Sequence, residues 1–267
     1  MHYRGSVRRS RTPRGSGLLY RLYMRRLRRQ LVGATHPRHV AMILDGNRRW
    51  ARLRVGGTSA LGHRAGAEKI VEFVRWCDEV GVGVVTLYLL STDNLTGRDS
   101  DELSELIDII GALAAELSST REWRVQRVGS RDGLPDALVA ALDEAEARSE
   151  GKQGLHINLA VGYGGRREIS DAVRAIVHQH SDSGGTLDEL AELVTPDKIA
   201  EHLYTGGQPD PDLVIRTSGE QRLSDFMLWQ SAHSEFYFVE ALGPDLREVD
   251  FVRALRDFSR RQRRYGQ

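Results

Sequence analysis

Short apolar segments alternate with longer segments of helical periodicity along most of this 267-residue chain. Residues 40–44 are all apolar, and residues 84–90 are apolar at all but one position, which is typical of strands buried on both faces. Further strands are expected at 123–128, 155–161, 212–216 and 236–239, and helices at 68–80, 103–117, 135–148, from 165 through 177, and 251–264. This alternation predicts a single α/β domain with a mainly parallel sheet flanked by helices.

The charges divide the chain into two parts. Residues 1–33 hold ten Arg and no acidic residue, although the whole chain has a net charge of only +1. Residues 34–267 therefore carry a net charge of −9. We expect a basic N-terminal arm at 1–33, with 1–17 disordered and 18–32 an amphipathic helix, ahead of an acidic globular body at 34–267.

The composition excludes several classes of protein. A single cysteine, Cys77, rules out an intrachain disulfide and favours a reducing, cytoplasmic compartment. The longest apolar run, 80–90, is too short to cross a bilayer. Arginines interrupt the apolar positions of the first 33 residues, so this segment is not a signal peptide.

Polar loops follow four of the predicted strands. They are 45–50 (Asp-Gly-Asn-Arg-Arg-Trp), 91–94 (Ser-Thr-Asp-Asn), 162–166 (Gly-Tyr-Gly-Gly-Arg) and 217–224, which follows Arg216. In parallel sheets, ligands bind beyond the carboxyl ends of the strands, so these loops are the candidate site. Capped helix starts and tight turns are the structural alternative for the first three loops.

The first and last of these loops have the chemistry of a diphosphate site. Asp45 can bind Mg²⁺ through an oxygen, Gly46 lets the backbone approach a ligand closely, and the following N–H groups can cradle phosphate. In the last loop, a buried strand ends in Arg216, and Arg222 and Ser224 follow within eight residues. Two arginines and hydroxyl groups on one loop suit a diphosphate, and a buried strand end has little other reason to carry an arginine.

Three motifs together resemble the cis-prenyltransferases, the undecaprenyl diphosphate synthase family. They are 39–51 (HVAMILDGNRRWA), 62–66 (GHRAG), and 215–220 (IRTSGE) continuing to Trp229 and Gln230. The resemblance begins at about residue 36 and does not include the arm. It implies a six-stranded sheet with a hydrophobic tunnel for the growing prenyl chain, a homodimer, and Mg²⁺-dependent condensation of isopentenyl diphosphate with an allylic diphosphate.

The resemblance also implies a role for individual residues. Asp45 would be the essential carboxylate and a Mg²⁺ ligand, Glu235 the second metal ligand, and Asn94 the residue that assists proton removal. Arg264 and Gly266 match a C-terminal motif that reaches the neighbouring subunit's diphosphate. The expected substrate-binding residues are Gly46, Asn47, Arg48, Arg49, Trp50, His63, Ser91, Thr92, Asp93, Arg98, Arg216, Arg222, Leu223 and Ser224.

Leu89 bears on the length of the product. Long-chain members of the family usually have a small residue, often Ala, two positions before the site serine, which is Ser91 here. A leucine there adds bulk near the site, so the chain resembles the short-chain enzymes that add one isopentenyl unit to geranyl diphosphate and form (2Z,6E)-farnesyl diphosphate. The alternative is a long-chain polyprenyl diphosphate synthase for cell-wall lipid carriers.

Two further alternatives come from other classes. A non-catalytic partner subunit of this family would lack the acidic residue at the first loop, whereas Asp45 is present. A nucleic-acid-binding protein would use the arginine-rich arm, but no base-stacking platform is evident and the body is acidic. We therefore expect no nucleic acid partner, and instead expect the basic arm to contact an anionic membrane surface.

Overall fold

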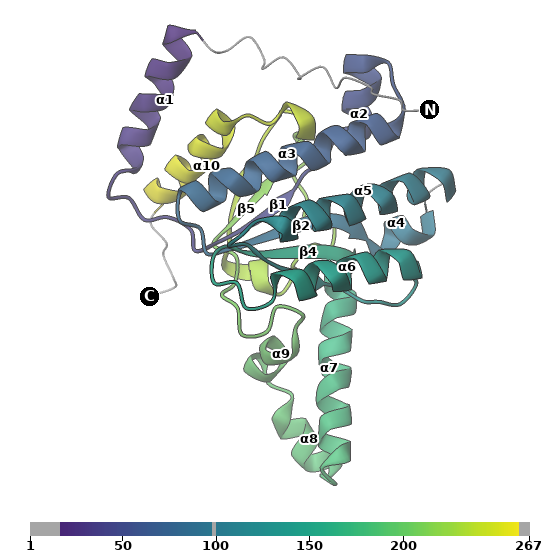
Figure 1. Ribbon diagram of the computed structural model, residues 1–267. Coiled ribbons are helices and arrows are strands. Elements are labelled where there is room, and N and C mark those ends of the chain that lie inside the picture. The colour runs from purple at the N-terminus through teal and green to yellow at the C-terminus, as the bar shows by residue number, and fades with distance from the viewer. Residues whose placement is uncertain (1–16, 98–99, 262–267) are drawn as a thin grey trace.

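A six-stranded sheet in which every pair of neighbouring strands is parallel forms the centre of the computed structural model (Figure 1), which describes residues 17–97 and 100–261. The strand order is β3-β4-β2-β1-β5-β6. The strands are β1 (His39–Ile43), β2 (Val84–Ser91), β3 (Arg124–Val128), β4 (His156–Tyr163), β5 (Leu213–Arg216) and β6 (Glu235–Phe238). The predicted fold class is confirmed.

The side chains of β1 alternate between two faces of the sheet, and both faces are buried. Val40 and Met42 belong to the main hydrophobic core, whereas Ala41 and Ile43 belong to a smaller cluster on the other face. Successive side chains of a strand point to opposite faces, so a run with no polar residue requires cover on both sides.

Helices connect the strands and cover the sheet. They are α1 (Leu18–Leu31), α2 (Asn47–Trp50), η1 (Ala51–Val55), α3 (Ser59–Glu79), α4 (Thr92–Gly97), α5 (Ser100–Ser119), α6 (Asp136–Ser149), α7 (Gly165–Asp182), α8 (Leu187–Leu193), α9 (Pro196–His202), η2 (Gln230–His233), η3 (Gly243–Asp245) and α10 (Glu248–Arg260). Here η1 is a π-helix, and η2 and η3 are 3₁₀-helices.

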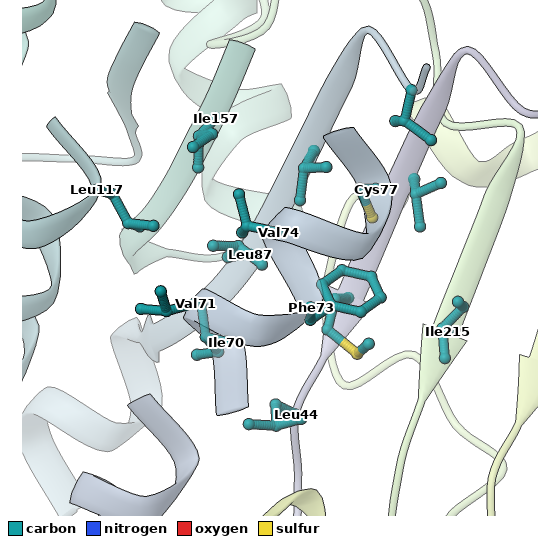
Figure 2. Packing of buried hydrophobic residues seen from close by; sticks show 14 of the residues in the cluster. Leu44, Ile70, Val71, Phe73, Val74, Cys77, Leu87, Leu117, Ile157 and Ile215 are labelled. Atoms are coloured by element: carbon teal, nitrogen blue, oxygen red, sulfur yellow. The ribbon is translucent and has the colours of Figure 1, made fainter. Parts of the chain in front are cut away.

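The main core lies between the sheet and the helices α3, α5, α6 and α10. Figure 2 shows Phe73 and Val74 of α3 pointing toward the sheet, near Leu87 of β2. These three side chains are fully buried. The helical stripe predicted at 68–80 is therefore the sheet-facing side of a helix that begins nine residues earlier, at Ser59.

The basic N-terminal helix is not a separate arm. It lies beside α10 (Figure 1), and Met24, Leu27 and Leu31 are buried in the main core. Arg28 forms an ion pair with Glu248 of α10. The apolar stripe of α1 thus belongs to the same core as the body, while the boundary expected at residue 33 stays a prediction. The disorder expected at 1–17 falls almost entirely outside the described residues.

Two short helices, α8 and α9, were not anticipated. Thr186 and Thr195 cap them by accepting hydrogen bonds from backbone N–H groups three residues later, at 3.3 Å and 3.2 Å. With α7 they extend beyond the edge of the sheet (Figure 1). Each has only seven residues, too few for a periodicity argument to separate it from a loop, although such threonine caps are a recognisable start signal.

Candidate active site

Asp45 and Arg216 meet at the carboxyl ends of two neighbouring parallel strands. Ile43 of β1 pairs with Arg216 of β5, and Asp45 follows two residues later. An Arg216 guanidinium N–H donates to Asp45 Oδ2 at 2.8 Å, and the Gly46 backbone N–H donates to Oδ1 at 2.6 Å. The chain leaves β1 toward β2 on one side, while β5 lies on the other side. This is the topological switch point at which α/β sheets bind ligands.

The Arg216 side chain is only 4% exposed. Its Nη1 donates to the Ser224 hydroxyl at 2.8 Å and to the backbone carbonyl of Arg222. Its Nε has no hydrogen-bond partner among the described residues. A buried cation with one carboxylate and an unused donor is suited to a second anion, because buried charge is costly without partners.

The loop after β5 has a strained backbone. Ser218, Ser224, Asp225 and Met227 have φ between 47° and 74°, and they are all of the non-glycine residues with positive φ in the described parts of the chain. Strain of this kind is maintained at ligand sites by surrounding contacts. One such contact is the turn after β4, where Gly165 N–H donates to the Asp225 carbonyl at 2.7 Å.

Basic side chains of α2 and α3 are paired with carboxylates at the mouth of the site. Arg48 Nε lies 3.9 Å from Glu102 Oε1, and His63 Nε2 lies 3.2 Å from the same oxygen. Arg49 Nη2 lies 3.4 Å from Glu220 Oε1. The two arginines are exposed, and ion pairs of this kind contribute about 0–1 kcal/mol, so a diphosphate can replace their carboxylates at little cost.

Two glycines of α3 allow α2 to pack closely against it. A Cβ atom at Gly62 would lie 2.1 Å from the Asn47 carbonyl oxygen, and one at Gly66 would lie 2.7 Å from the Asn47 amide nitrogen. Residues four apart share a helix face, so both glycines face the start of α2. The motif 62–66 is thereby explained: its glycines make room for Asn47, and His63 lies between them at the site.

These groups open into one cavity of about 920 Å³. Its polar part is lined by the predicted residues Asp45, Gly46, Asn47, Arg48, Arg49, His63, Ser91, Asp93, Asn94, Arg216, Arg222 and Ser224. Its apolar part is lined by Ala67 and Ile70 of α3, Leu89 and Leu90 of β2, and Leu106, Ile109, Ile110 and Leu113 of α5. A cationic mouth therefore continues into an apolar wall.

Other predicted residues lie outside the cavity lining. The Trp50 indole N–H donates to Asp245 Oδ1 at 2.9 Å, so the ring is held against η3. Thr92 contacts the turn after β4, and Leu223 accepts a backbone hydrogen bond from Phe226 at 3.1 Å. The expectations for Arg98 and for the C-terminal motif at 264–266 lie outside the described residues.

Glu235 is not brought together with Asp45. It begins β6 opposite Leu213, three residues before Arg216, which is about 10 Å back along the sheet at 3.3 Å per residue. There it forms an ion pair with Arg261. Within one chain, therefore, these two carboxylates are too far apart to bind the same metal ion, and the role of Glu235 as a metal ligand stays a prediction. The register of β6 decides this, and sequence spacing does not reveal it.

Tyr88 is a site residue that the sequence analysis missed. Its hydroxyl donates to the Ser224 carbonyl at 3.1 Å, and its ring stacks on Phe226 with centroids 4.6 Å apart. Burial raises the pKa of the Tyr88 phenol to about 12, so it stays protonated at neutral pH. The available signal was a phenol within an otherwise aliphatic strand next to Ser91.

Comparison with known proteins identifies the class. Residues 43–266 match the family model described as "Putative undecaprenyl diphosphate synthase", and the chain belongs to this family of cis-prenyltransferases. The predicted family and enzyme class are thus confirmed.

Three relatives illustrate the similarity. The chain is 58% identical over 248 residues to a (2Z,6E)-farnesyl diphosphate synthase of Thermobifida fusca, covering 93% of this chain and 97% of that protein. It is 51% identical over 257 residues to a short-chain Z-isoprenyl diphosphate synthase of Mycobacterium bovis, covering 95% and 98%. The crystal structure of lavandulyl diphosphate synthase from Lavandula x intermedia with dimethylallyl diphosphate superposes with a TM-score of 0.80, 34% identity and coverage of 87% and 99%.

Among the described residues, no helix has the length and apolar character needed to cross a membrane.

Proposed function

We propose that this enzyme joins isopentenyl diphosphate to geranyl diphosphate, forms a cis double bond, and releases (2Z,6E)-farnesyl diphosphate and diphosphate. The observation that carries the proposal is the single cavity of about 920 Å³, which combines a cationic mouth with an apolar wall. One prenyl diphosphate has both chemical characters, with an anionic head and a hydrocarbon tail.

The two substrates occupy different parts of the mouth. Arg216, Arg222 and Ser224 bind the diphosphate of isopentenyl diphosphate, while the backbone of the 46–49 loop and His63 bind the allylic diphosphate. Support comes from the Arg216 guanidinium, which already donates to Ser224 and keeps its Nε available. The Asp45–Arg216 hydrogen bond links the two subsites.

The reaction requires stabilisation of negative charge. The allylic C–O bond breaks and its electron pair leaves with diphosphate. The double bond of isopentenyl diphosphate then attacks the allylic carbon, and a proton is lost from the new chain. Arginine side chains and backbone N–H groups stabilise the diphosphate as its charge grows. We propose Asn94, which lines the cavity, as the residue that assists removal of the proton.

Asp45 is suited to hold a divalent metal ion, which we propose is Mg²⁺. Each of its oxygens accepts one hydrogen bond and retains further acceptor capacity, and the carboxylate is partly exposed at the mouth. Mg²⁺ commonly binds one or two carboxylates together with substrate phosphates. When bound, the ion would neutralise charge on the diphosphate.

The product is short because bulky side chains narrow the apolar wall. Leu89 lines the cavity where long-chain members of the family usually have a smaller residue. The names of the Thermobifida and Mycobacterium relatives, both short-chain synthases, support the same conclusion.

Labelled isopentenyl diphosphate with geranyl diphosphate and Mg²⁺ tests the proposal, with products separated by length. We expect mainly the fifteen-carbon product from the wild type, and loss of about a hundredfold or more in rate for Asp45→Asn, because the carboxylate holds both the ion and Arg216. A main product of fifty or fifty-five carbons would contradict the short-chain proposal.

We also propose that the enzyme is a homodimer. Phe236 and Phe238 stack on the edge strand β6 and remain partly exposed, and an unpaired strand edge favours association. Sedimentation at increasing concentration should give the mass of two chains, and a constant mass of one chain would contradict this.

Peripheral contact with the cytoplasmic face of a membrane is a further part of the proposal. Leu18, Leu19 and Leu22 of α1 are 67%, 82% and 50% exposed, beside the exposed Arg21 and Arg25. Apolar side chains flanked by arginines favour an anionic bilayer surface.

Co-sedimentation with phosphatidylglycerol vesicles tests the membrane contact. Leu19→Glu with Leu22→Glu should abolish binding, whereas Leu187→Glu on α8, which replaces a leucine 83% exposed, should leave it unchanged. Equal binding by all three proteins would remove α1 as the contact.

A further inference from the structure

The helical run 47–55 is held in one orientation by a carboxylate of η3. The run has no break, because the backbone N–H of the first residue of η1 donates to carbonyls of α2. The Trp50 indole N–H donates to Asp245 Oδ1 at 2.9 Å, and the Arg54 guanidinium donates to Asp245 Oδ2 at 3.0 Å and 3.1 Å. Residues 50 and 54 are four apart, so they share a helix face, and that face is turned toward η3.

The same spacing places Arg48 and Arg52 together on another face of the run. Both line the cavity, and so does Arg49, three residues before Arg52. Residues three and four apart are neighbours on a helix surface. The cavity side of the run therefore carries three arginines within little more than one helical turn.

Arg52 differs from the other arginines of this run in its partners. Each of the other three forms an ion pair with a carboxylate, at distances from 3.0 Å to 3.9 Å. Among the residues that the structure describes, none forms a hydrogen bond or an ion pair with the Arg52 side chain. A diphosphate must displace a carboxylate to reach Arg48 or Arg49, whereas Arg52 can bind it without losing a contact.

A preference of charge for water does not by itself account for the position of Arg52. A surface helix normally turns its apolar side chains toward the protein and its charged ones toward solvent. In η1, however, Leu53 and Val55 are 71% and 53% exposed, while the exposed Arg52 borders the cavity. The π-helical geometry of this segment is rare and occurs frequently at functional sites.

Arg52 lies beside the turn of α3 that carries His63. A Cβ atom at Gly62 would lie 3.1 Å from the Ala51 Cβ, so the start of η1 packs directly on this turn. Ser59 and His63, four apart on α3, line the same cavity. Arg52 therefore belongs to the part of the mouth that contains His63, and not to the part formed by the loop after β5.

We propose that Arg52 is a further binding residue for the allylic diphosphate, which it shares with Arg48. The inference rests on the proposed function and deepens it, because it adds a cation to the subsite formed by the 46–49 loop and His63. Cβ atoms one turn apart on a helix are about 5–6 Å from each other. Two guanidinium groups at this spacing can each donate to one phosphate of the same diphosphate.

The KM for each substrate tests this inference, with Arg52→Gln as the variant and Arg64→Gln as the matched control. Arg64 is also an exposed arginine near His63 with no hydrogen bond or ion pair to a described residue, but it does not line the cavity. In steady-state assays with Mg²⁺, Arg52→Gln should raise the KM for geranyl diphosphate by about tenfold, because a charge-assisted hydrogen bond is lost. The KM for isopentenyl diphosphate should stay at the wild-type value, and Arg64→Gln should retain both values.

Binding of geranyl diphosphate alone gives a second measurement that does not depend on turnover. Calorimetry with Mg²⁺ and without isopentenyl diphosphate should show a dissociation constant about tenfold higher for Arg52→Gln than for the wild type. Arg52→Lys should lie between the two, because lysine keeps the charge but lacks the forked donors.

The outcomes separate the inference from the proposed function. If the wild type does not condense geranyl diphosphate with isopentenyl diphosphate, the proposed function fails and the inference fails with it. If the wild type does so, and Arg52→Gln keeps the wild-type KM and dissociation constant for geranyl diphosphate, only the inference is overturned. An equal rise in Arg64→Gln would also overturn it, because the loss of any nearby positive charge would then explain the effect. An equal rise in KM for both substrates would overturn it too, since it would indicate a distorted mouth.

Discussion

Arg216 illustrates how one residue can be positioned by the fold and still be available for a ligand. The strand carries it into the core, where Asp45 balances its charge and Ser224 accepts one of its hydrogen bonds. Its planar, forked guanidinium can contact a carboxylate and a phosphate at the same time, which a lysine ammonium on a flexible stem does less well.

Arg216→Lys should therefore reduce kcat/KM for isopentenyl diphosphate by about a hundredfold, because the positive charge remains but the fork of donors is lost. Steady-state kinetics with each substrate varied in turn gives this value. Arg166→Lys, an exposed arginine outside the cavity lining, is the control and should retain wild-type kinetics. Normal turnover by Arg216→Lys would exclude a bidentate role for this arginine.

Much of the site was predictable at the residue scale, for a physical reason. Parallel strands present their carboxyl ends at one edge, so polar residues directly after strands, such as Asp45 and Asn94, must lie near one another. The distance of Glu235 from Asp45 depends on which end of β6 carries Glu235, and no local sequence pattern predicts this. Tyr88 was missed because a phenol in an apolar strand resembles a core residue until its partners are known.

At the scale of the element, α1 shows the limit of a periodicity argument. Its apolar stripe predicts an amphipathic helix, but the stripe does not say what it covers. The helix packs on α10, with Leu27 only 2% exposed, while Leu19 near its N-terminus is 82% exposed. Strand β2 is a similar case. The run 84–90 predicts a strand, but it does not predict the β-bulge at Leu89, where the register with β4 shifts.

The packing of α1 has a measurable consequence for stability. Leu27→Ala should lower the free energy of unfolding by about 2–5 kcal/mol, the usual loss for a fully buried leucine. Leu19→Ala should change it by less than about 0.5 kcal/mol, as exposed substitutions do. Urea unfolding followed by circular dichroism measures both. If Leu27→Ala is as stable as the wild type, α1 is an independent arm after all.

At the scale of the whole molecule, acid should weaken the fold through His39. The side chain is buried, with its ring nitrogens bonded to the Pro209 carbonyl at 2.7 Å and the Thr86 hydroxyl at 2.8 Å. Burial lowers its pKa to about 4, below the value of about 6.5 in an unfolded chain. Between these values the unfolded state binds a proton that the native state does not.

The stability that His39 contributes is thus fully present above about pH 6.5 and is lost as the pH falls toward 4. The loss from this residue between neutral pH and pH 5 is about 2 kcal/mol. Urea titrations at both pH values should show a smaller acid loss for His39→Gln than for the wild type. Part of the acid loss should remain in His39→Gln, because burial also lowers the pKa of His156 to about 4. His178→Gln, at an exposed position, should behave as the wild type.

In the proposed function, one cavity binds both diphosphates and stops elongation after one addition. The most direct measurement is the product distribution of the wild-type enzyme as the ratio of isopentenyl diphosphate to geranyl diphosphate is raised. If the cavity wall limits the length of the prenyl chain, the fifteen-carbon product should dominate at every ratio. Progressively longer products as isopentenyl diphosphate increases would contradict this function. The supply of isopentenyl diphosphate, and not the cavity wall, would then determine the product length.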